Sequence, residues 1–264
     1  MIILTTCLIS ISIGMSLGLI GAGGSILTIP ALVYILKIDP LTSSVYSMFI
    51  VGTSSLVGGI KSFSKNLVDF KIVTLFGIPS LVGVLIARNI IYPSIPAQLQ
   101  LINNFTVSKS ALFMFCIFVI MFYVGIKMLI KSKKDSTPEK SKDSKSILLP
   151  VQGLFIGTLT ALLGIGGGFL IVPALFFWTN LSIKKTIGTT LLIIAINALV
   201  SFLVSYSKTI LNWQFLLLFS AGSMIGMFLG IKTRDSITGI HLTKIFGWLV
   251  LSISLFIAYK EFSG

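Results

Sequence analysis

The chain has 264 residues, of which 55% are hydrophobic and only 10% are charged, whereas about 25% of the residues in a soluble domain are charged. Its net charge is +13, but the Lys and Arg residues lie almost wholly between apolar segments, where positive charge sets membrane topology. This distribution argues against a nucleic-acid-binding role. The apolar runs do not alternate with polar residues, which excludes a β-barrel. We therefore expect an α-helical protein embedded in the lipid bilayer.

Eight apolar segments follow one another along the chain, and each is long enough to cross most or all of about 30 Å of hydrocarbon. In chain order they are 2–36, 40–60, 70–87, 110–130, 147–181, 186–207, 211–231 and 242–259. The polar, lysine-rich stretch 131–146 predicts a solvated linker. The chain therefore divides into a first transmembrane repeat at 1–130, the linker at 131–146 and a second transmembrane repeat at 147–264.

The same glycine-rich phrase occurs in both of the long segments, 143 residues apart. Residues 19–32 (LIGAGGSILTIPAL) align without a gap on residues 162–175 (LLGIGGGFLIVPAL). The offset holds over about residues 14–90 and 157–233, while the last span of each half corresponds only loosely. Such a repeat predicts two related halves, each with a helix broken at the corresponding place.

Each long segment exceeds one crossing, because a helix over 2–36 would measure about 52 Å. It either overhangs the bilayer or turns back at its glycines as a hairpin. Hairpins place 15 of the 20 basic residues on one side, against 12 for single crossings, although seven of the 15 lie in or beside the linker. The first split favours hairpins. A hairpin plus three crossings is an odd number, so we expect two inverted repeats with a cytoplasmic linker and both termini outside. The predicted fold class is an all-α polytopic membrane protein with two inverted repeats, each a glycine-broken helical hairpin plus three transmembrane helices.

The glycine phrases predict an anion site made of backbone. Irregular backbone survives in a membrane only where it is buried in protein or lines a polar cavity, and each glycine disfavours a helix by about 1 kcal/mol. The proline that follows suits the first turn of a restarting helix, whose free N–H groups attract anions. Close helix packing is the alternative role for such glycines, and it is the role expected for Gly83, Gly222, Gly226 and Gly230. The substrate-binding residues predicted from the phrases are Gly21, Gly23, Gly24, Ser25, Pro30, Gly164, Gly166, Gly167, Gly168 and Pro173.

Hydroxyls and one amide complete the predicted site. Ser47 aligns with Thr190, and we add both to the substrate-binding set, together with Thr189 and the mid-span amide of Asn197, although lone hydroxyls in membrane helices mostly bond to their own carbonyls. Arg88 lies near a span end and is expected to assist entry. The sequence carries no nucleophile–base pair, metal-ligand cluster or carboxylate near the centre of a span. We therefore predict no enzyme activity, metal or cofactor.

Two segments of the form GxGG(G) followed by proline, opening the halves of a polytopic chain of this length, resemble the sulfite exporter TauE/SafE family of membrane permeases. The resemblance implies a multi-pass protein of the cell inner membrane that transports small anions, such as sulfite or organosulfonates. Ser25 stands where the second copy has Gly168, which departs from the glycine pattern. Alternating access around the two broken helices is the expected mechanism, and an anion channel is the alternative. The cargo, its direction, the coupling ion and the oligomeric state, including a homodimer, stay open.

Overall fold

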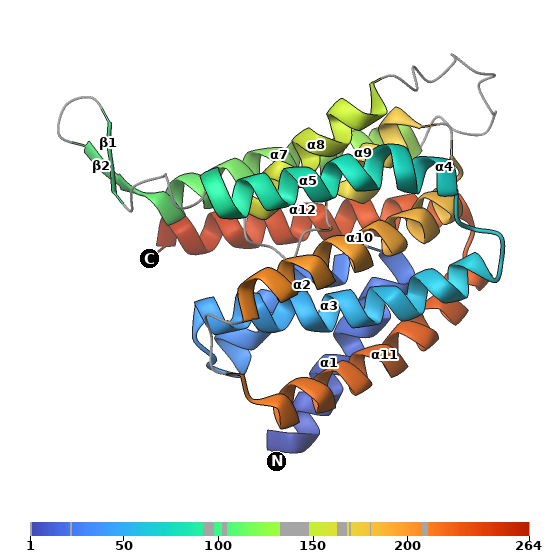
Figure 1. The fold of residues 1–264 in the computed structure, drawn as a ribbon, viewed down its shortest axis with the longest axis horizontal. Helices are drawn as coiled ribbons and strands as arrows, with labels where there is room; N and C mark the ends of the chain where they lie inside the picture. The colour runs from blue at the N-terminus through green and yellow to red at the C-terminus, as the bar shows by residue number, and fades with distance from the viewer. Residues whose placement is uncertain are drawn as a thin grey trace.

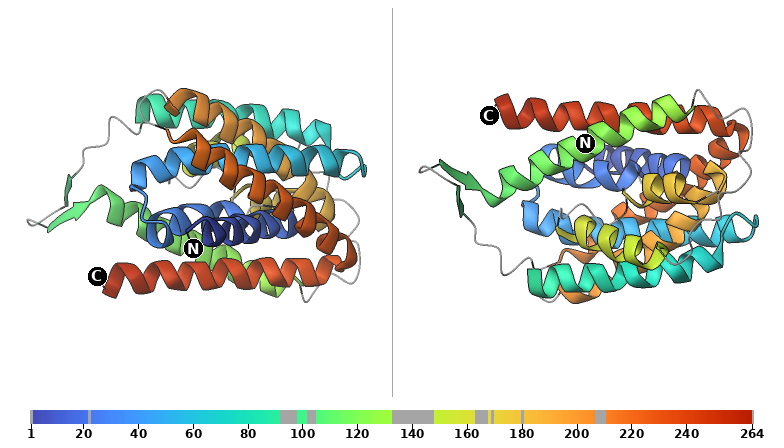
Figure 2. Two further views of the ribbon diagram at one scale, coloured as in Figure 1. Left: turned by 90° about the horizontal axis from the view of Figure 1, so that it is seen from below. Right: turned by 90° about the horizontal axis from the view of Figure 1, so that it is seen from above.

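The structure is a computed structural model of the chain. It describes residues 2–21, 23–91, 98–101, 105–132, 148–162, 168, 170–179, 181–206 and 211–263. These residues are helical apart from their connections and one short hairpin of strands, and the helices run roughly along one common axis (Figures 1 and 2). Five of the described helices are long and apolar enough to cross a membrane. The all-helical, membrane-spanning architecture agrees with the sequence-based prediction.

The elements follow the predicted order of segments. Those of the first half are α1 (Ile2–Ile20), α2 (Gly23–Pro30), the π-helical turn η1 (Ala31–Ile35), α3 (Pro40–Phe63), α4 (Phe70–Ile72), η2 (Val73–Gly77), α5 (Ile78–Ile86), η3 (Ala87–Ile91), β1 (Gln98–Leu101), β2 (Phe105–Ser108) and α7 (Lys109–Ser132). Those of the second half are α8 (Leu149–Leu162), α9 (Ile171–Trp178), α10 (Ile183–Ser205), α11 (Trp213–Ser236) and α12 (Gly239–Ser263). The segment from α4 to η3 forms one continuous span.

Side-chain caps start the long helices at matching places in the two halves. Asp39 accepts hydrogen bonds from two backbone N–H groups at the start of α3, and Ser182 accepts one at the start of α10. Asp69 caps α4 and Asn212 caps α11 in the same manner. Each cap satisfies N–H groups that lack a partner within the helix. The members of each pair lie 143 residues apart, so the repeat extends to local backbone chemistry.

The first glycine phrase reverses the chain. Gly21 adopts a φ of +83°, a left-handed conformation that glycine tolerates best. The next helix then packs back against α1, since a Cβ at Gly24 would lie 2.7 Å from the backbone oxygen of Ile13. The segment 2–36 is therefore a helical hairpin and not a single straight helix. The corresponding turn of the second half, 163–167, lies outside the described residues, although α8 and α9 on either side of it are in contact.

Two pairs of parallel helices join the halves. The helix α1 runs alongside α11, with Gly14 against Ser223 and Gly18 against Gly230. In the same way α8 runs alongside α5, with Gly157 packed against the backbone of Ser80. Glycine at such crossings lets two backbones approach closely in a membrane. The same contacts include the four glycines assigned to helix packing from the sequence, and they confirm that assignment for Gly83, Gly222, Gly226 and Gly230.

The central helices α3 and α10 cross in opposite directions. Gly52 packs against Leu199, and Gly59 packs against Leu192, so residue numbers rise along one helix as they fall along the other. Both helices are largely buried inside the bundle. Their antiparallel register places the middle of the crossing close to the level of Ser54 and Asn197.

The last helices of the two halves, α7 and α12, pack against each other, as the green and red ribbons in Figure 2 show. Gly125 of α7 lies against Leu251, and Gly247 of α12 lies against Leu129. The connection before α7 contains the antiparallel hairpin β1–β2, which the sequence analysis did not predict, at one end of the molecule (Figure 1). The connection before α12 is only two residues long. The extra connection explains why the last spans fail to align at the common offset.

Charged side chains gather where α3 and α11 end and α10 begins. Lys65 and Asp235 form an ion pair, and the ammonium of Lys184 donates a 3.0 Å hydrogen bond to the backbone oxygen of Asp235. Lys185 lies 3.6 Å from the carboxylate of Asp69. We call this region the charged end. The hairpin arrangement inferred from the basic residues groups Lys65 with Lys184 on one side, whereas single crossings would have separated them.

Candidate functional site

Both glycine phrases approach one face of α10. A Cβ at Gly21 would lie 2.9 Å from Cγ2 of Ile187, and a Cβ at Gly168 would lie 2.5 Å from Cδ1 of Ile194. Thr190 lies between these two isoleucines, and residues spaced by three, four or seven share a helix face. Seven residues of helix span about 10 Å. The two phrases therefore contact the same helix face about 10 Å apart, with Thr190 between them.

Thr190 has the properties expected of a ligand-binding hydroxyl. Its side chain is 0% exposed, and its Oγ1 has no hydrogen-bond partner among the described residues. A buried hydroxyl without a partner is costly in hydrocarbon. The neighbouring Thr186 is also buried, but its hydroxyl bonds to the backbone oxygen of Ser182 at 3.0 Å. Of these two threonines on α10, Thr190 alone keeps a hydroxyl that a ligand could satisfy.

The first glycine phrase also touches the second hairpin. A Cβ at Gly21 would lie 3.4 Å from Cγ2 of Val172, close to the start of α9. The turn at Gly21 is followed directly by α2, which begins at Gly23 and continues through Ser25. The first backbone N–H groups of such a helix have no partner within it. The arrangement thus brings a helix start, α9 and the face of α10 around Thr190 into one region.

Ser47 occupies the corresponding place on α3. It aligns with Thr190, it is 0% exposed, and its Oγ likewise has no hydrogen-bond partner among the described residues. Each of the two residues lies seven positions before the middle of the α3–α10 crossing, but the helices are antiparallel. The two hydroxyls are therefore displaced toward opposite ends, about 20 Å apart by helix rise. The structure does not bring Ser47 and Thr190 into a single site.

Two other predicted site residues serve the architecture. The hydroxyl of Thr189 accepts a 3.0 Å hydrogen bond from the backbone N–H of Asp69 and donates a 2.8 Å bond to the backbone oxygen of Lys185. The side-chain amide of Asn197 donates a 2.9 Å hydrogen bond to the hydroxyl of Ser80, while its Oδ1 has no partner in the described part of the chain. Both side chains thus hold helices together.

Pro30 does not begin a helix, which corrects the role predicted for it. The helix α2 restarts at Gly23, so Pro30 is its last residue and leads into the π-helical turn η1. Proline lacks an N–H and disturbs the regular helical ladder, and a widened turn accommodates that disturbance. Pro173, by contrast, lies in the first turn of α9, where it is buried as predicted. Gly164, Gly166 and Gly167 lie outside the described residues.

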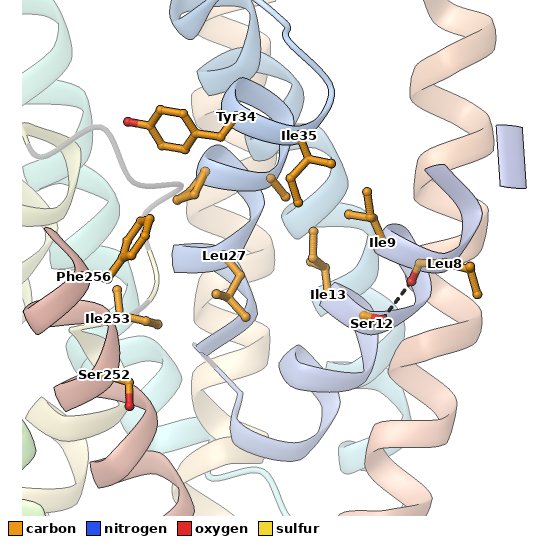
Figure 3. Close-up of a pocket in the computed structure, with 12 residues that line it drawn as sticks. Leu8, Ile9, Ser12, Ile13, Leu27, Tyr34, Ile35, Ser252, Ile253 and Phe256 are labelled. Atoms are coloured by element: carbon orange, nitrogen blue, oxygen red, sulfur yellow. Dashed lines mark hydrogen bonds between the residues drawn. The ribbon is translucent and has the colours of Figure 1, made fainter. Parts of the chain in front are cut away.

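A groove of about 580 Å³ opens between the first hairpin and α12, beside Pro30 (Figure 3). It is lined by Leu8, Ile9, Ser12, Ile13, Leu27, Pro30, Ala31, Tyr34, Ile35, Ser252, Ile253 and Phe256. The hydroxyl of Ser12 bonds to the backbone oxygen of Leu8 at 2.8 Å. Such an apolar lining suits hydrocarbon and does not suit an anion.

A second hollow, of about 370 Å³, lies at the end opposite the charged end. The residues around it are Thr6, Leu36, Ile38, Tyr46, Asn212, Phe215 and Leu218. The hydroxyl of Tyr46 accepts a 2.7 Å hydrogen bond from the backbone N–H of Asn212. This hollow combines aromatic and aliphatic walls with several polar groups, and it opens where α3 and α11 begin.

The sequence analysis did not assign Arg234 to the site. Its guanidinium is 0% exposed, near the end of α11, and its Nη2 donates a 3.3 Å hydrogen bond to the hydroxyl of Ser62. From the sequence, Arg234 was one of the basic residues that mark a span end. Its rarity was the available signal, because the chain contains only two arginines, Arg88 and Arg234.

The chain matches one known family over almost its whole length. The family described as sulfite exporter TauE/SafE matches residues 6–257. The glycine phrases, the central helices and both arginines all fall within the matched range. No solved structure matches the chain significantly.

Curated relatives from several bacteria are named as transporters. A "Probable membrane transporter protein" of Xylella fastidiosa is 26% identical over 260 residues, which cover 96% of this chain and 93% of the relative. A protein with the same name from Haemophilus influenzae is 30% identical over 209 residues, covering 77% and 74% of the two chains. The "Probable membrane transporter protein YunE" of Bacillus subtilis is 27% identical over 233 residues, covering 80% and 81%.

Proposed function

This chain belongs to the sulfite exporter TauE/SafE family, and we propose that it is a secondary transporter of small anions in the cell inner membrane. Family, relatives and helices together identify a multi-pass membrane transporter. The proposed cargo is a small sulfur-containing anion such as sulfite or an organosulfonate, in line with the family description. The observation that carries the proposed site is the buried, unpartnered hydroxyl of Thr190 between the two glycine phrases.

Reciprocal contacts support an inverted relationship between the halves. The backbone N–H of Asn212 bonds to the hydroxyl of Tyr46, and the backbone N–H of Asp69 bonds to the hydroxyl of Thr189. Adding 143 to the members of one contact gives the members of the other, with the halves exchanged. The first contact lies at the end opposite the charged end, and the second lies near the charged end. Exchange of ends together with exchange of halves is what a two-fold axis in the membrane plane produces.

The different states of the two ends support alternating access. Near Tyr46 and Asn212 the molecule is hollowed by about 370 Å³. At the charged end, the ion pairs of Lys65 with Asp235 and of Lys185 with Asp69 link helices of the two halves. An arrangement that is open at one end and held together at the other is one of the two states that a rocking transporter needs.

In the proposed binding mode, the anion occupies the region between the glycine phrases. Free N–H groups at the start of α2 and the hydroxyl of Thr190 bind it, because a helix start carries a partial positive charge. Ser47 serves the equivalent position in the other half. The remaining predicted residues of the second phrase, Gly164, Gly166, Gly167 and Gly168, contribute backbone N–H groups around the same path.

The test compares two identical substitutions on one helix. We expect Thr190→Val to raise the KM for anion transport about tenfold, because it removes a hydroxyl that only the ligand satisfies. Thr186→Val serves as the control, since that hydroxyl bonds within its own helix. Purified protein is reconstituted into liposomes, and uptake of sulfite, taurine, sulfoacetate and sulfate is measured with and without a pH gradient.

Two results would contradict the proposal. If the parent protein carries none of these anions, the assigned substrate class is wrong. If Thr190→Val inserts normally and transports with the KM of the parent, the binding site lies elsewhere. Saturable flux without electrical conductance is expected, and a steady anion conductance would identify a channel instead of a transporter.

A further inference from the structure

The only two arginines of the chain make equivalent contacts in the two halves. The Nη2 of Arg234 donates a 3.3 Å hydrogen bond to the hydroxyl of Ser62, and the Nη1 of Arg88 donates a 2.5 Å bond to the hydroxyl of Ser205. Ser62 and Ser205 lie 143 residues apart, near the ends of α3 and α10. Each arginine comes from the helix of the opposite half, so the two bonds are exchanged like the other reciprocal contacts.

The arginines themselves do not align in the sequence. At the common offset Arg88 corresponds to Ile231, three residues before Arg234. Three residues are nearly one helical turn, so both side chains start from the same face of equivalent helices, one turn apart. Sequence alignment of the halves therefore pairs Arg88 with an isoleucine, whereas the structure pairs it with Arg234 through the two serines.

Arg234 lies at the level of the first glycine turn. The parallel helices α1 and α11 place Gly230 against Gly18, and Arg234 follows Gly230 by one turn, as Gly21 follows Gly18. A second line of contacts agrees. Ile187, which touches Gly21, precedes Gly188, and a Cβ at Gly188 would lie 3.0 Å from Cβ of Ser62, the partner of Arg234.

Arg88 stands in the same relation to the second glycine phrase. Its neighbour Ala87 packs in a small buried cluster with Ala161 of α8, and the phrase begins three residues after Ala161. The parallel course of α5 and α8 carries Arg88 to the level of that phrase. Each half thus sends one arginine to the broken helix of the other half, and the two arginines lie toward opposite ends of the molecule.

The guanidinium of Arg234 is incompletely satisfied. Its side chain is 0% exposed, and neither Nε nor Nη1 has a hydrogen-bond partner among the described residues. The nearest carboxylate is that of Asp235, 3.8 Å from Nε, and it pairs with Lys65. A buried cation with unused donors is unfavourable unless a counter-charge joins it. The planar fork of a guanidinium fits two oxygens of one oxyanion, which a lysine ammonium does not match.

We propose that Arg234 and Arg88 are anion-binding residues at the two opposite mouths of the transport path, each oriented by its serine, Ser62 or Ser205. The ligand class is a small oxyanion with at least two exposed oxygens, such as sulfite or a sulfonate. Arg234 receives the anion at the charged end, and Arg88 receives it at the opposite end. This assignment rests on the proposed anion-transport function and adds to it the residues that recognise the cargo on each side.

The experiment measures KM from each side of the membrane, with sulfite as the probe. The full-length protein is reconstituted, and its orientation is determined by labelling of a single cysteine. We expect Arg234→Gln to raise the KM about tenfold or more when sulfite is supplied at the charged end, and Arg88→Gln to do so from the opposite end. From the other side, each KM stays within about twofold of the parent. Ser62→Ala and Ser205→Ala shift the KM on the same sides by a smaller factor.

The controls remove one positive charge at each end without touching an arginine. Lys61→Gln acts at the charged end and Lys37→Gln at the opposite end, and both side chains are exposed. Neither is expected to change the KM. Arg234→Lys keeps the charge but loses the planar fork, so it is expected to raise the KM nearly as much as the glutamine variant. If Arg234→Gln fails to insert, the lysine variant and Ser62→Ala carry the test.

The outcomes separate this inference from the proposed function. If the parent carries sulfite but the arginine variants keep its KM from both sides, the arginine assignment is overturned and anion transport stands. The same holds if both arginines act from one side only. If the parent carries none of the tested anions, the proposed function fails, and the arginine assignment fails with it.

Discussion

The side-chain amide of Asn197 donates a 2.9 Å hydrogen bond to the hydroxyl of Ser80, and the residues that align with this pair, Ser54 and Ser223, are bonded at 2.8 Å. Each bond joins a central helix of one half to a helix of the other. Both lie near the middle of the α3–α10 crossing, where side chains are buried and water is absent. A buried polar pair of this kind fixes the rotation of the helices it joins.

Double-mutant cycles should detect both bonds. We expect Asn197→Ala with Ser80→Ala, and Ser54→Ala with Ser223→Ala, to couple by about 0.6 kcal/mol each, with roughly 1.7 kcal/mol as the upper range for membrane helices. The free energy of unfolding is measured in detergent for each single and double variant. Coupling near zero in both cycles would show that the two bonds do not tie the halves together.

Equivalent glycines at the helix crossings should tolerate a methyl group equally badly. A Cβ at Gly14 would overlap the backbone oxygen of Ser223, and a Cβ at Gly157 would overlap that of Ser80. Because backbone cannot move aside cheaply, Gly14→Ala and Gly157→Ala should each destabilise the protein by about 1–3 kcal/mol. Gly239→Ala is the control, since its Cβ would meet only a side-chain methyl of Ile183, at 3.1 Å. Thermal unfolding of the purified variants measures the difference, and an effect confined to one half would count against equivalent packing.

Two glycines of the first phrase should fail in different ways. The sequence-based expectation was that Gly24→Leu inserts normally and abolishes transport. In the structure a side chain at Gly24 would overlap Leu17 of α1, so we now expect this variant to lose folded protein. Gly21→Ala meets left-handed backbone, which costs a non-glycine residue about 1–2 kcal/mol, and it should reduce transport more than yield. Size-exclusion profiles and sulfite uptake separate the two effects. Equal yields for both variants would contradict the packing role of Gly24.

The orientation of the chain stays a prediction that labelling can decide. We expect the linker on the cytoplasmic side and both termini outside, because the hairpin arrangement gathers 15 of the 20 basic residues with the linker. In a chain freed of Cys7 and Cys116, a cysteine at Ser141 should react with an impermeant reagent only after the membrane is opened. Labelling of intact cells at Ser141 would reverse the assignment, and opposite sides for the two termini would refute a hairpin in each half.

Local features of the chain were predictable because they depend on composition and on backbone chemistry. Long apolar runs predicted the spans, and the aligned glycine phrases predicted two related halves. The break at Gly21 followed from the poor helix propensity of glycine, and its positive φ confirms a turn there. The distribution of basic residues also pointed to a hairpin. Pro30 was misplaced because the helix could restart before it, at Gly23, and nothing local to the proline reveals that choice.

The tertiary structure decided which buried polar groups face one another. Ser47 and Thr190 align in the sequence, yet the antiparallel crossing of α3 and α10 sends them toward opposite ends. Thr189 was expected to bind substrate, but packing directs its hydroxyl to the backbone of Asp69. Arg234 meets Ser62 across 172 residues of chain. Such contacts depend on the rotation and direction of whole helices, which hydrophobicity and glycine content do not specify, and only the packed bundle determines them.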